Sequence, residues 1–228
     1  MKIAIMQPYL FPYIGYFQLI DAVDVFVIYD DVNYIKGGWI NRNFILNQSK
    51  SLRITLPLDE QSPNKLINQI SIKDHSNKLL ETIRHSYAKA PCFHEASPLI
   101  QRILMNSENN LAQFLTHQLK EVIDYLGIKI DWRISSSINK DNTLHGQEKV
   151  IAICEELGAT HYINAIGGKE LYDHESFEKR GIELSFIQSE PITYTQFTDF
   201  VPNLSIIDVL MFNTPSQISK LIKNYHLI

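Results

Sequence analysis

Two adjacent carboxylates, Asp30 and Asp31, directly follow an apolar run at residues 25–28 that has the pattern of a buried strand. Neighbouring carboxylates at the end of a strand can hold a magnesium ion, orient a ribose or act as a base. A solvated turn, or an Asx-type cap on the following residues, explains the same pair without a function. Because successive residues point in opposite directions, we expect only one of the two to face a site. Asp31 is the expected base, on the condition that burial raises its pKa toward neutrality.

Residues 36–42 are a second candidate, an anion-binding turn with the sequence Lys-Gly-Gly-Trp-Ile-Asn-Arg. Its two glycines let backbone N–H groups approach a phosphate, while Lys36 and Arg42 supply positive charge and Trp39 a stacking face. Glycine pairs also occur in ordinary hairpin turns, and the spacing alone favours neither interpretation. Arg42 is the expected phosphate clamp, and Asn41 beside it belongs to the same expected binding set.

A loop rich in aromatic residues follows the first apolar run, residues 3–6, and begins at Gln7. Its aromatic residues are Tyr9, Phe11, Tyr13, Tyr16 and Phe17. Since ligands of open α/β sheets bind beyond the carboxyl ends of the strands, the loop and Gln7 are expected to border the ligand crevice, with tyrosines stacking on a sugar or base. We expect Phe17 to be core and at least one hydroxyl of Tyr13 and Tyr16 to face the crevice. Tyr16 is the third expected catalytic residue.

A third candidate is the pair Gly167-Gly168, which follows a strand expected at residues 160–163. A glycine-rich turn between a strand and a helix can bind phosphate or allow close packing, although the full dinucleotide-binding fingerprint is missing. His145 precedes a helix, where it could cap the helix or move protons. The other seven histidines have no metal-ligand spacing, and the sequence has no GxSxG, Walker or HExxH motif.

The remaining patterns indicate the elements that position these residues. Further strands are expected at residues 52–56, 68–72, 128–134 and 182–187, and further helices at residues 147–157 and from residue 216 onward. Apolar residues at helical spacing predict a helical insertion or subdomain over residues 75–127, with Pro98 in the first turn of its second helix. Ser205 is expected to cap a later helix, with Asp208 near a capping-box position. The order of elements indicates a single α/β domain over residues 1–228, with a mostly parallel open sheet built from βαβ units.

Composition limits the possible partners. The chain has 228 residues and a formal net charge of −4, so it offers no basic stripe for nucleic acid. No apolar run approaches the roughly 20 residues of a membrane span, and the first residues lack a signal-peptide pattern. We therefore expect a cytoplasmic protein without nucleic-acid partners or membrane insertion. Cys92 and Cys154 are far apart in sequence and are expected to be small buried residues, not a disulfide or zinc pair.

Several segments together resemble the WbqC-like protein family. The matching segments near the start are Gln7-Pro8, Phe11-Pro12-Tyr13-Ile14-Gly15-Tyr16-Phe17, Tyr29-Asp30-Asp31-Val32 and Trp39-Ile40-Asn41-Arg42-Asn43. Later matches are Tyr162-Ile163-Asn164 with Gly167-Gly168, Tyr194 with Gln196, and Asn203-Leu204-Ser205-Ile206-Ile207-Asp208. The matches are spaced over nearly the whole chain, and they add Asn164, Tyr194 and Gln196 to the expected binding residues.

The resemblance implies a role in the cytosolic assembly of a surface polysaccharide, because genes for this family occur in bacterial O-antigen clusters. The expected activity is transfer of an acyl or aminoacyl group onto the amine of a nucleotide-linked amino sugar. The donor would be a thioester of coenzyme A or of a carrier protein, and no tightly bound cofactor is expected. Two alternatives stay open: an ATP-dependent nucleotidylyltransferase or ligase that uses magnesium, and a non-catalytic partner within a biosynthetic complex.

A weaker resemblance concerns the nucleotidylyltransferase-type folds. Tyr13-Ile14-Gly15-Tyr16, at the start of an expected helix, looks like the HxGH region in which two histidines meet the phosphates of ATP. Here both histidine positions are tyrosines, whose phenols are neutral near pH 7 and carry no cation. The resemblance therefore implies a similar fold, while adenylyl transfer would lack the two cationic side chains.

Overall fold

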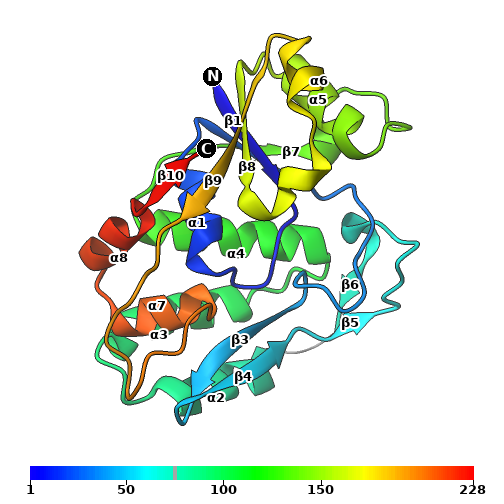
Figure 1. Ribbon diagram of the computed structural model, residues 1–228. Helices are drawn as coiled ribbons and strands as arrows, with labels where there is room; N and C mark the ends of the chain where they lie inside the picture. Colours follow the sequence, from blue (N-terminus) through cyan, green and yellow to red (C-terminus); the bar gives the residue numbers. More distant parts are fainter. Residues whose placement is uncertain (74–75) are drawn as a thin grey trace.

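A six-stranded, mostly parallel sheet organises the computed structural model, which describes residues 1–73 and 76–228 (Figure 1). Its strands lie in the order β10-β9-β8-β1-β2-β7, and only β10 is antiparallel to its neighbour. Their bounds are β1 (Lys2–Met6), β2 (Val25–Ile28), β7 (Asp131–Ile134), β8 (His161–Ala165), β9 (Glu183–Ser189) and β10 (Tyr225–Leu227). The predicted α/β class with a mostly parallel open sheet is confirmed.

The first βαβ unit is the centre of this sheet. β1 and β2 are parallel, with Ile3 opposite Val25, and the helix α1 (Ile14–Asp21) connects them. Alternate strand residues face two different cores, since Ile3 and Val25 belong to one apolar cluster and Ala4 and Phe26 to the other. Both strands are therefore buried on both faces, as a parallel sheet requires.

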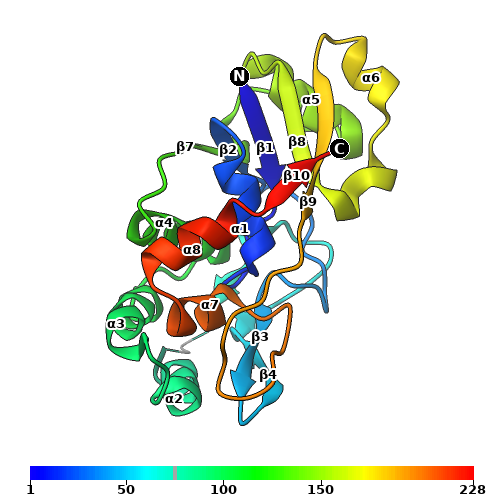
Figure 2. The same ribbon diagram turned by 60° about the vertical axis from the view of Figure 1, so that its left-hand side comes forward.

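Helices cover the two faces of the sheet (Figure 2). On one face, α5 (Gly146–Glu156) and α6 (His174–Glu178) pack over the smaller core. On the other face lie α1, α4 (Leu111–Tyr125) and α8 (Pro215–Ile222), whose buried residues join the larger core. No helix of the described residues is long and apolar enough to cross a membrane.

The segment between β2 and β7 lies on the side of the sheet toward which β1 points (Figure 1). Its elements are the hairpin β3 (Arg42–Asn47) and β4 (Lys50–Thr55), the short pair β5 (Leu58–Asp59) and β6 (Ser71–Ile72), the 3₁₀ helix η1 (Ile67–Gln69), and the helices α2 (Ser76–Tyr87), α3 (Phe93–Leu104) and α4. The predicted helical stretch of residues 75–127 thus contains three helices, and its first residue lies outside the described residues. The stretch shares the larger core with the sheet.

Several predicted boundaries differ from the structure. Pro98 lies inside α3, because the buried stripe of this helix begins at Ala96 and the helix starts at Phe93. The strand predicted at residues 68–72 is divided, because Asn68 and Gln69 end the 3₁₀ helix η1 while Ile70 and β6 are extended. Ser205 caps α7 (Ile206–Phe212) as predicted, whereas the Asp208 carboxylate takes part in a different network described below. Both cysteines are buried and free, as predicted.

Candidate active site at the carboxyl edge of the sheet

Three predicted residues follow the carboxyl ends of adjacent strands. Gln7 follows β1, Asp30 follows β2, and Gly167 follows β8, and these strands are neighbours in the order β8-β1-β2. The prediction that these residues share one edge of one sheet is confirmed. They do not line one cavity, because Asp30 alone of the three borders a cavity of about 760 Å³ at this edge.

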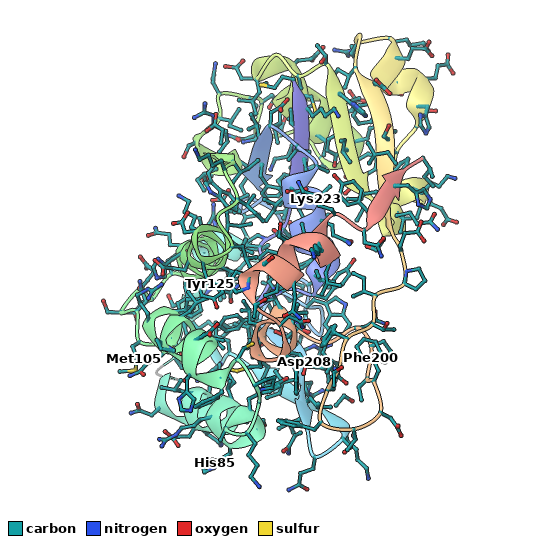
Figure 3. The ribbon with its side chains drawn as sticks, turned by 90° about the vertical axis from the view of Figure 1, so that its left-hand side faces the viewer. His85, Met105, Tyr125, Phe200, Asp208 and Lys223 are labelled. Atoms are coloured by element: carbon teal, nitrogen blue, oxygen red, sulfur yellow. The ribbon has the colours of Figure 1, made fainter. Side chains whose placement is uncertain are left out.

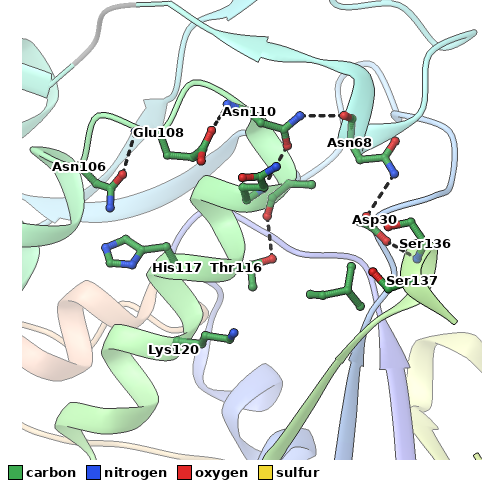
Figure 4. Close-up of a pocket in the computed structure, with 13 residues that line it drawn as sticks. Asp30, Asn68, Asn106, Glu108, Asn110, Thr116, His117, Lys120, Ser136 and Ser137 are labelled. Carbon is green, nitrogen blue, oxygen red and sulfur yellow. Dashed lines mark hydrogen bonds between the residues drawn. The ribbon is translucent and has the colours of Figure 1, made fainter.

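This cavity has a volume of about 760 Å³ and a predominantly polar lining (Figure 4). Its lining residues are Asp30, Asn68, Asn106, Glu108, Asn110, Ala112, Gln113, Thr116, His117, Lys120, Ile134, Ser136 and Ser137. They come from the end of β2, the end of β7, the approach to α4 and one side of α4 itself. We call it the polar cavity.

Asp30 anchors the wall of the polar cavity. Its carboxylate accepts hydrogen bonds from the Ser136 backbone N–H at 2.9 Å, the Ser136 hydroxyl at 2.6 Å and the Asn68 amide at 3.1 Å. Ser136 lies in the 3₁₀ helix η2 (Ser135–Ser137) after β7, and Asn68 lies in η1. One buried carboxylate therefore joins two strand ends to the inserted segment, which fixes the shape of the cavity.

The opposite wall is built by α4 and the residues before it. Asn110 caps α4 by accepting a hydrogen bond from the Gln113 N–H, and its amide donates to the Asn68 carbonyl at 2.7 Å. The Lys120 ammonium has no carboxylate partner among the residues that the structure describes. The His117 Nε2 atom is buried and has no hydrogen-bond partner among them.

Asp31 points to a different cavity, of about 560 Å³, that is also bordered by Tyr29, His145 and Lys149. Its carboxylate lies 2.9 Å from the Lys140 ammonium and 3.0 Å from that of Lys149, and all three side chains are at least 90% buried. Burial raises the pKa of Asp31, but Ser135 and the two lysines lower it more, so its pKa lies below the ordinary value. The condition on which Asp31 was expected to act as a base, a pKa raised toward neutrality, is therefore not met.

The expectation that one carboxylate faces a site needs a correction, because each borders its own cavity. Asn68 and Ser136 line both cavities, so the hydrogen bonds of Asp30 form a shared wall. The partners of the two carboxylates leave no shared metal site between them, since ammonium groups surround Asp31 and neutral donors surround Asp30. Among the described residues, no group of three His, Cys, Asp or Glu side chains could hold a metal ion.

Tyr16 belongs to the core and not to a cavity wall. Its ring is buried against Tyr9, Phe17 and Phe26, and its hydroxyl donates to the Gln7 carbonyl at 2.9 Å. Burial raises the pKa of Tyr16 well above its ordinary value. The prediction that Tyr16 is catalytic is therefore corrected, because its hydroxyl is used to hold the backbone at the end of β1. Phe17 is core, as predicted.

Tyr9, Tyr13 and Trp39 meet elsewhere, at a cavity of about 330 Å³. Arg42 is the first residue of β3, and its guanidinium lies near Gly37, since a Cβ placed on Gly37 would be 3.7 Å from Arg42 Nη2. The φ of Gly37 is +81°, in the left-handed region that favours glycine. Lys36 is exposed on the same turn. Neither cation lines the polar cavity or the cavity beside Asp31, so the predicted clamp is separated from the predicted base.

Two predicted binding residues have structural partners. The Asn41 amide donates to the Leu56 carbonyl at 2.8 Å, and its oxygen accepts the Tyr34 hydroxyl at 2.9 Å. Asn164 ends the buried part of β8, and a Cβ on Gly168 would lie 2.4 Å from its Nδ2 atom. Gly168 therefore makes room for the Asn164 side chain, which is the close-packing role considered for this glycine pair. No atom lies within 4 Å of a Cβ placed on Gly167.

Tyr194 and Gln196 bind a buried carboxylate of the chain itself. The Tyr194 hydroxyl and the Gln196 amide donate to Asp208 Oδ2 at 2.6 and 2.7 Å, and the Tyr87 hydroxyl donates to Oδ1 at 2.8 Å. Figure 3 shows Asp208 in the interior of the half of the molecule that lies beyond the sheet. Burial raises the pKa of Asp208 despite these three donors. These residues hold the C-terminal segment against α2 and β3.

The α4 residues that line the polar cavity, and the buried Lys140 and Lys149, were not predicted from the sequence. Gln113, Thr116 and Lys120 recur at helical spacing along α4, which is a readable polar stripe. Lys149 lies directly before Val150 and Ile151, within the buried face of α5, and a lysine at such a position needs a partner.

Comparison with known proteins shows to which family the chain belongs. Residues 7–220 match the family model of the WbqC-like protein family, which is nearly the whole chain. The chain belongs to the WbqC-like protein family. An uncharacterized protein of Mycobacterium tuberculosis, Rv1507c, is 28% identical over 222 residues, which is 95% of each chain. No solved structure matches this WbqC-like protein significantly.

Proposed function

We propose that this WbqC-like protein transfers an acyl or aminoacyl group from a thioester to the amine of a nucleotide-linked amino sugar. The reaction would serve bacterial O-antigen or surface-polysaccharide synthesis in the cytoplasm, and coenzyme A or a carrier protein would hold the thioester. The observation that supports this proposal best is the polar cavity, which combines amides, hydroxyls, carboxylates and one unpaired ammonium at the carboxyl edge of a parallel sheet.

The lining matches the parts of such a sugar nucleotide. The amides of Asn68, Asn106 and Gln113 can donate to and accept from sugar hydroxyls. The Lys120 ammonium suits a phosphate, which carries negative charge. Asp30 and Glu108 add negative charge for the ammonium form of the amino group.

In the proposed reaction the amine nitrogen attacks the thioester carbonyl carbon, an amide C–N bond forms, and the C–S bond breaks. The amine loses a proton and the thiol leaves with one. Asp30 accepts the amine proton in this proposal, because it borders the polar cavity, while Asp31 is too well stabilised as a carboxylate. The second cavity, across the wall of Asn68 and Ser136, offers a place for the thioester arm.

The alternative of adenylyl transfer has less support. Tyr16, at the second histidine position of the HxGH-like segment, is buried and donates to a backbone carbonyl. It cannot supply the cation that stabilises phosphate charge in that chemistry. Release of pyrophosphate from ATP would reverse this preference.

Calorimetric titration with UDP-glucosamine and UDP-glucose tests the proposal, because the two probes differ by the amine. The wild type should bind UDP-glucosamine more tightly, and Asp30→Asn should reduce that preference. Lys120→Met should weaken both by about 1.5–3 kcal/mol, the value of a charge-assisted contact. Mass spectrometry with a panel of coenzyme A thioesters should then detect the amide product. In the same assay, His117→Gln tests whether His117, and not Asp30, accepts the amine proton. If neither probe binds, or both bind equally, the proposal is overturned.

A further inference from the structure

Two adjoining cavities form an aromatic groove that shares no residue with the polar cavity. One, of about 330 Å³, is lined by Tyr9, Pro12, Tyr13, Trp39, Asn43 and Asn203. The other, of about 430 Å³, shares Tyr13 and Asn203 with it and continues past Tyr194 and Phe200. Because two side chains border both, the two cavities make one elongated groove beside the first loop, and we call it the aromatic groove.

Two large rings of this groove are exposed. Tyr13 is 43% exposed and Trp39 is 53% exposed, and exposed aromatic surface of this kind commonly marks a binding site. The rings are also held in place. A Cβ on Gly15 would lie 2.4 Å from the Tyr13 ring, so this ring rests directly on the glycine, and Trp39 packs edge-on against Phe44. The aromatic faces are therefore presented by the fold.

Neutral polar groups without partners accompany these faces. Among the described residues, no hydrogen bond is made by the hydroxyls of Tyr9 and Tyr13, the indole N–H of Trp39 or the Asn203 amide. Asn43 differs, because its amide donates to two backbone carbonyls of the loop and its oxygen accepts the Phe44 N–H. The groove thus offers free donors and acceptors next to ring faces, with Asn43 as a fixed wall.

Charge is almost missing from the lining. Within residues 1–73 and 76–228, no charged side chain borders the 330 Å³ cavity, and Glu190 is the one charged residue that borders the 430 Å³ cavity. A phosphate or carboxylate would find no cation here, and a cationic ligand would find one carboxylate at the far end. The chemistry fits a neutral ligand that has apolar faces and a rim of hydroxyl groups.

We propose that the aromatic groove is a binding site for neutral sugar rings, with a pyranose on Tyr9, Tyr13 and Trp39 and the saccharide continuing past Tyr194. A pyranose presents C–H faces that stack on aromatic rings and equatorial hydroxyls that reach the phenols, the indole N–H and Asn203. Volumes at the lower end of the usual range of about 300–1,000 Å³ for ligand pockets suit one ring in each cavity. The site does not depend on the transfer reaction proposed above.

An array of neutral oligosaccharides, built from gluco-, galacto-, manno- and N-acetylhexosamine pyranoses, tests this site. Binding is then quantified by isothermal titration calorimetry for every variant, and by Trp39 fluorescence in a Trp132→Phe background, which leaves one tryptophan, for the variants that keep Trp39. The wild-type groove should bind at least one neutral saccharide, and Trp39→Ala and Tyr13→Ala should each weaken it about tenfold or more with an unchanged melting temperature. Gly15→Ala should weaken binding by moving the Tyr13 ring without removing it.

Matched controls distinguish this site from the polar cavity and from other ligands. Lys120→Met should leave saccharide binding unchanged, and Trp39→Ala should leave UDP-glucosamine binding unchanged. Uridine and pantetheine, the other neutral ligands that aromatic faces could hold, should bind more weakly than the best saccharide. The proposal is overturned if no saccharide on the array binds, if uridine or pantetheine binds as tightly, or if Lys120→Met removes saccharide binding.

Discussion

Asp31 and Asp208 are both buried carboxylates, yet the fold treats them in opposite ways. Asp31 is held by the ammonium groups of Lys140 and Lys149, and its pKa is lowered. Asp208 is held by two phenols and one amide, and its pKa is raised. Burial pushes both pKa values upward, so the charge of the partners decides the outcome. Burial at a strand end or helix is therefore not enough to predict a base.

The two clusters also support different surfaces. The cluster of Asp31 joins the end of β2 to α5 and to the loop after β7, beside the cavity of about 560 Å³. The cluster of Asp208 positions Tyr194, which lines the aromatic groove. The Asp31 cluster, which contains two ammonium groups, thus lies beside the candidate active site. The Asp208 cluster, whose donors are neutral, supports one wall of the candidate saccharide site.

The largest effect should come from Asp31→Asn. The substitution removes the negative charge between two buried ammonium groups, and breaking a buried ion pair costs about 3–5 kcal/mol. Urea denaturation should show this loss in the free energy of unfolding. Asp131→Asn is the control, because its ion pair with Arg133 is exposed and should be worth about 0–1 kcal/mol. Equal losses in the two variants would show that the buried cluster is not an ion pair in solution.

Asp208→Asn should cost less. It keeps the shape of the side chain and removes one acceptor oxygen from three donors, which should cost about 1–3 kcal/mol. The same urea titration measures it beside Asp31→Asn. A larger loss than that of Asp31→Asn would reverse the comparison.

Tyr194→Phe should cost about 1 kcal/mol, since it removes one neutral donor and leaves Asp208 with Tyr87 and Gln196. The variant should also loosen the wall of the aromatic groove and weaken saccharide binding slightly. A change in UDP-glucosamine binding with Tyr194→Phe would contradict the separation of the two sites.

The smallest effect is a difference in the pH dependence of stability. Asp208 has a raised pKa, so its contribution is complete below the ordinary value of about 3.9 and is lost as the pH rises through the raised value. Asp31 has a lowered pKa, so its contribution is present above about 3.9 and is lost as the pH falls through the lowered value. In urea titrations, the wild type should lose stability relative to Asp208→Asn as the pH rises above about 3.9, and relative to Asp31→Asn as the pH falls below about 3.9. Slopes of the same sign would refute the assignment.

Local pattern predicted the sheet well and the site only in part. The runs that became β1 and β2 have the composition of buried strands, and the carboxylates after β2 lie at the carboxyl edge as expected. The partners of Asp31 could not be predicted, because Lys140 and Lys149 are distant in sequence and their pairing depends on the position of β7. Local pattern also could not say which tyrosine of the first loop is buried, since α1 turns Tyr16 inward and leaves Tyr13 outside.

The position of β1 has a consequence for how the chain folds during synthesis. One edge of β1 pairs with β2, where Ile3 is opposite Val25, and β2 follows soon after in the sequence. The other edge of β1 pairs with β8, where Ile3 is opposite Tyr162. At about 5–20 residues per second, the ribosome makes β8 on the order of ten seconds after β2. During that interval β1 has one unpaired edge, and Asp31 has no Lys149 to neutralise it. The nascent chain therefore has an open sheet edge until β8 is made, and an unpaired edge of this kind favours aggregation.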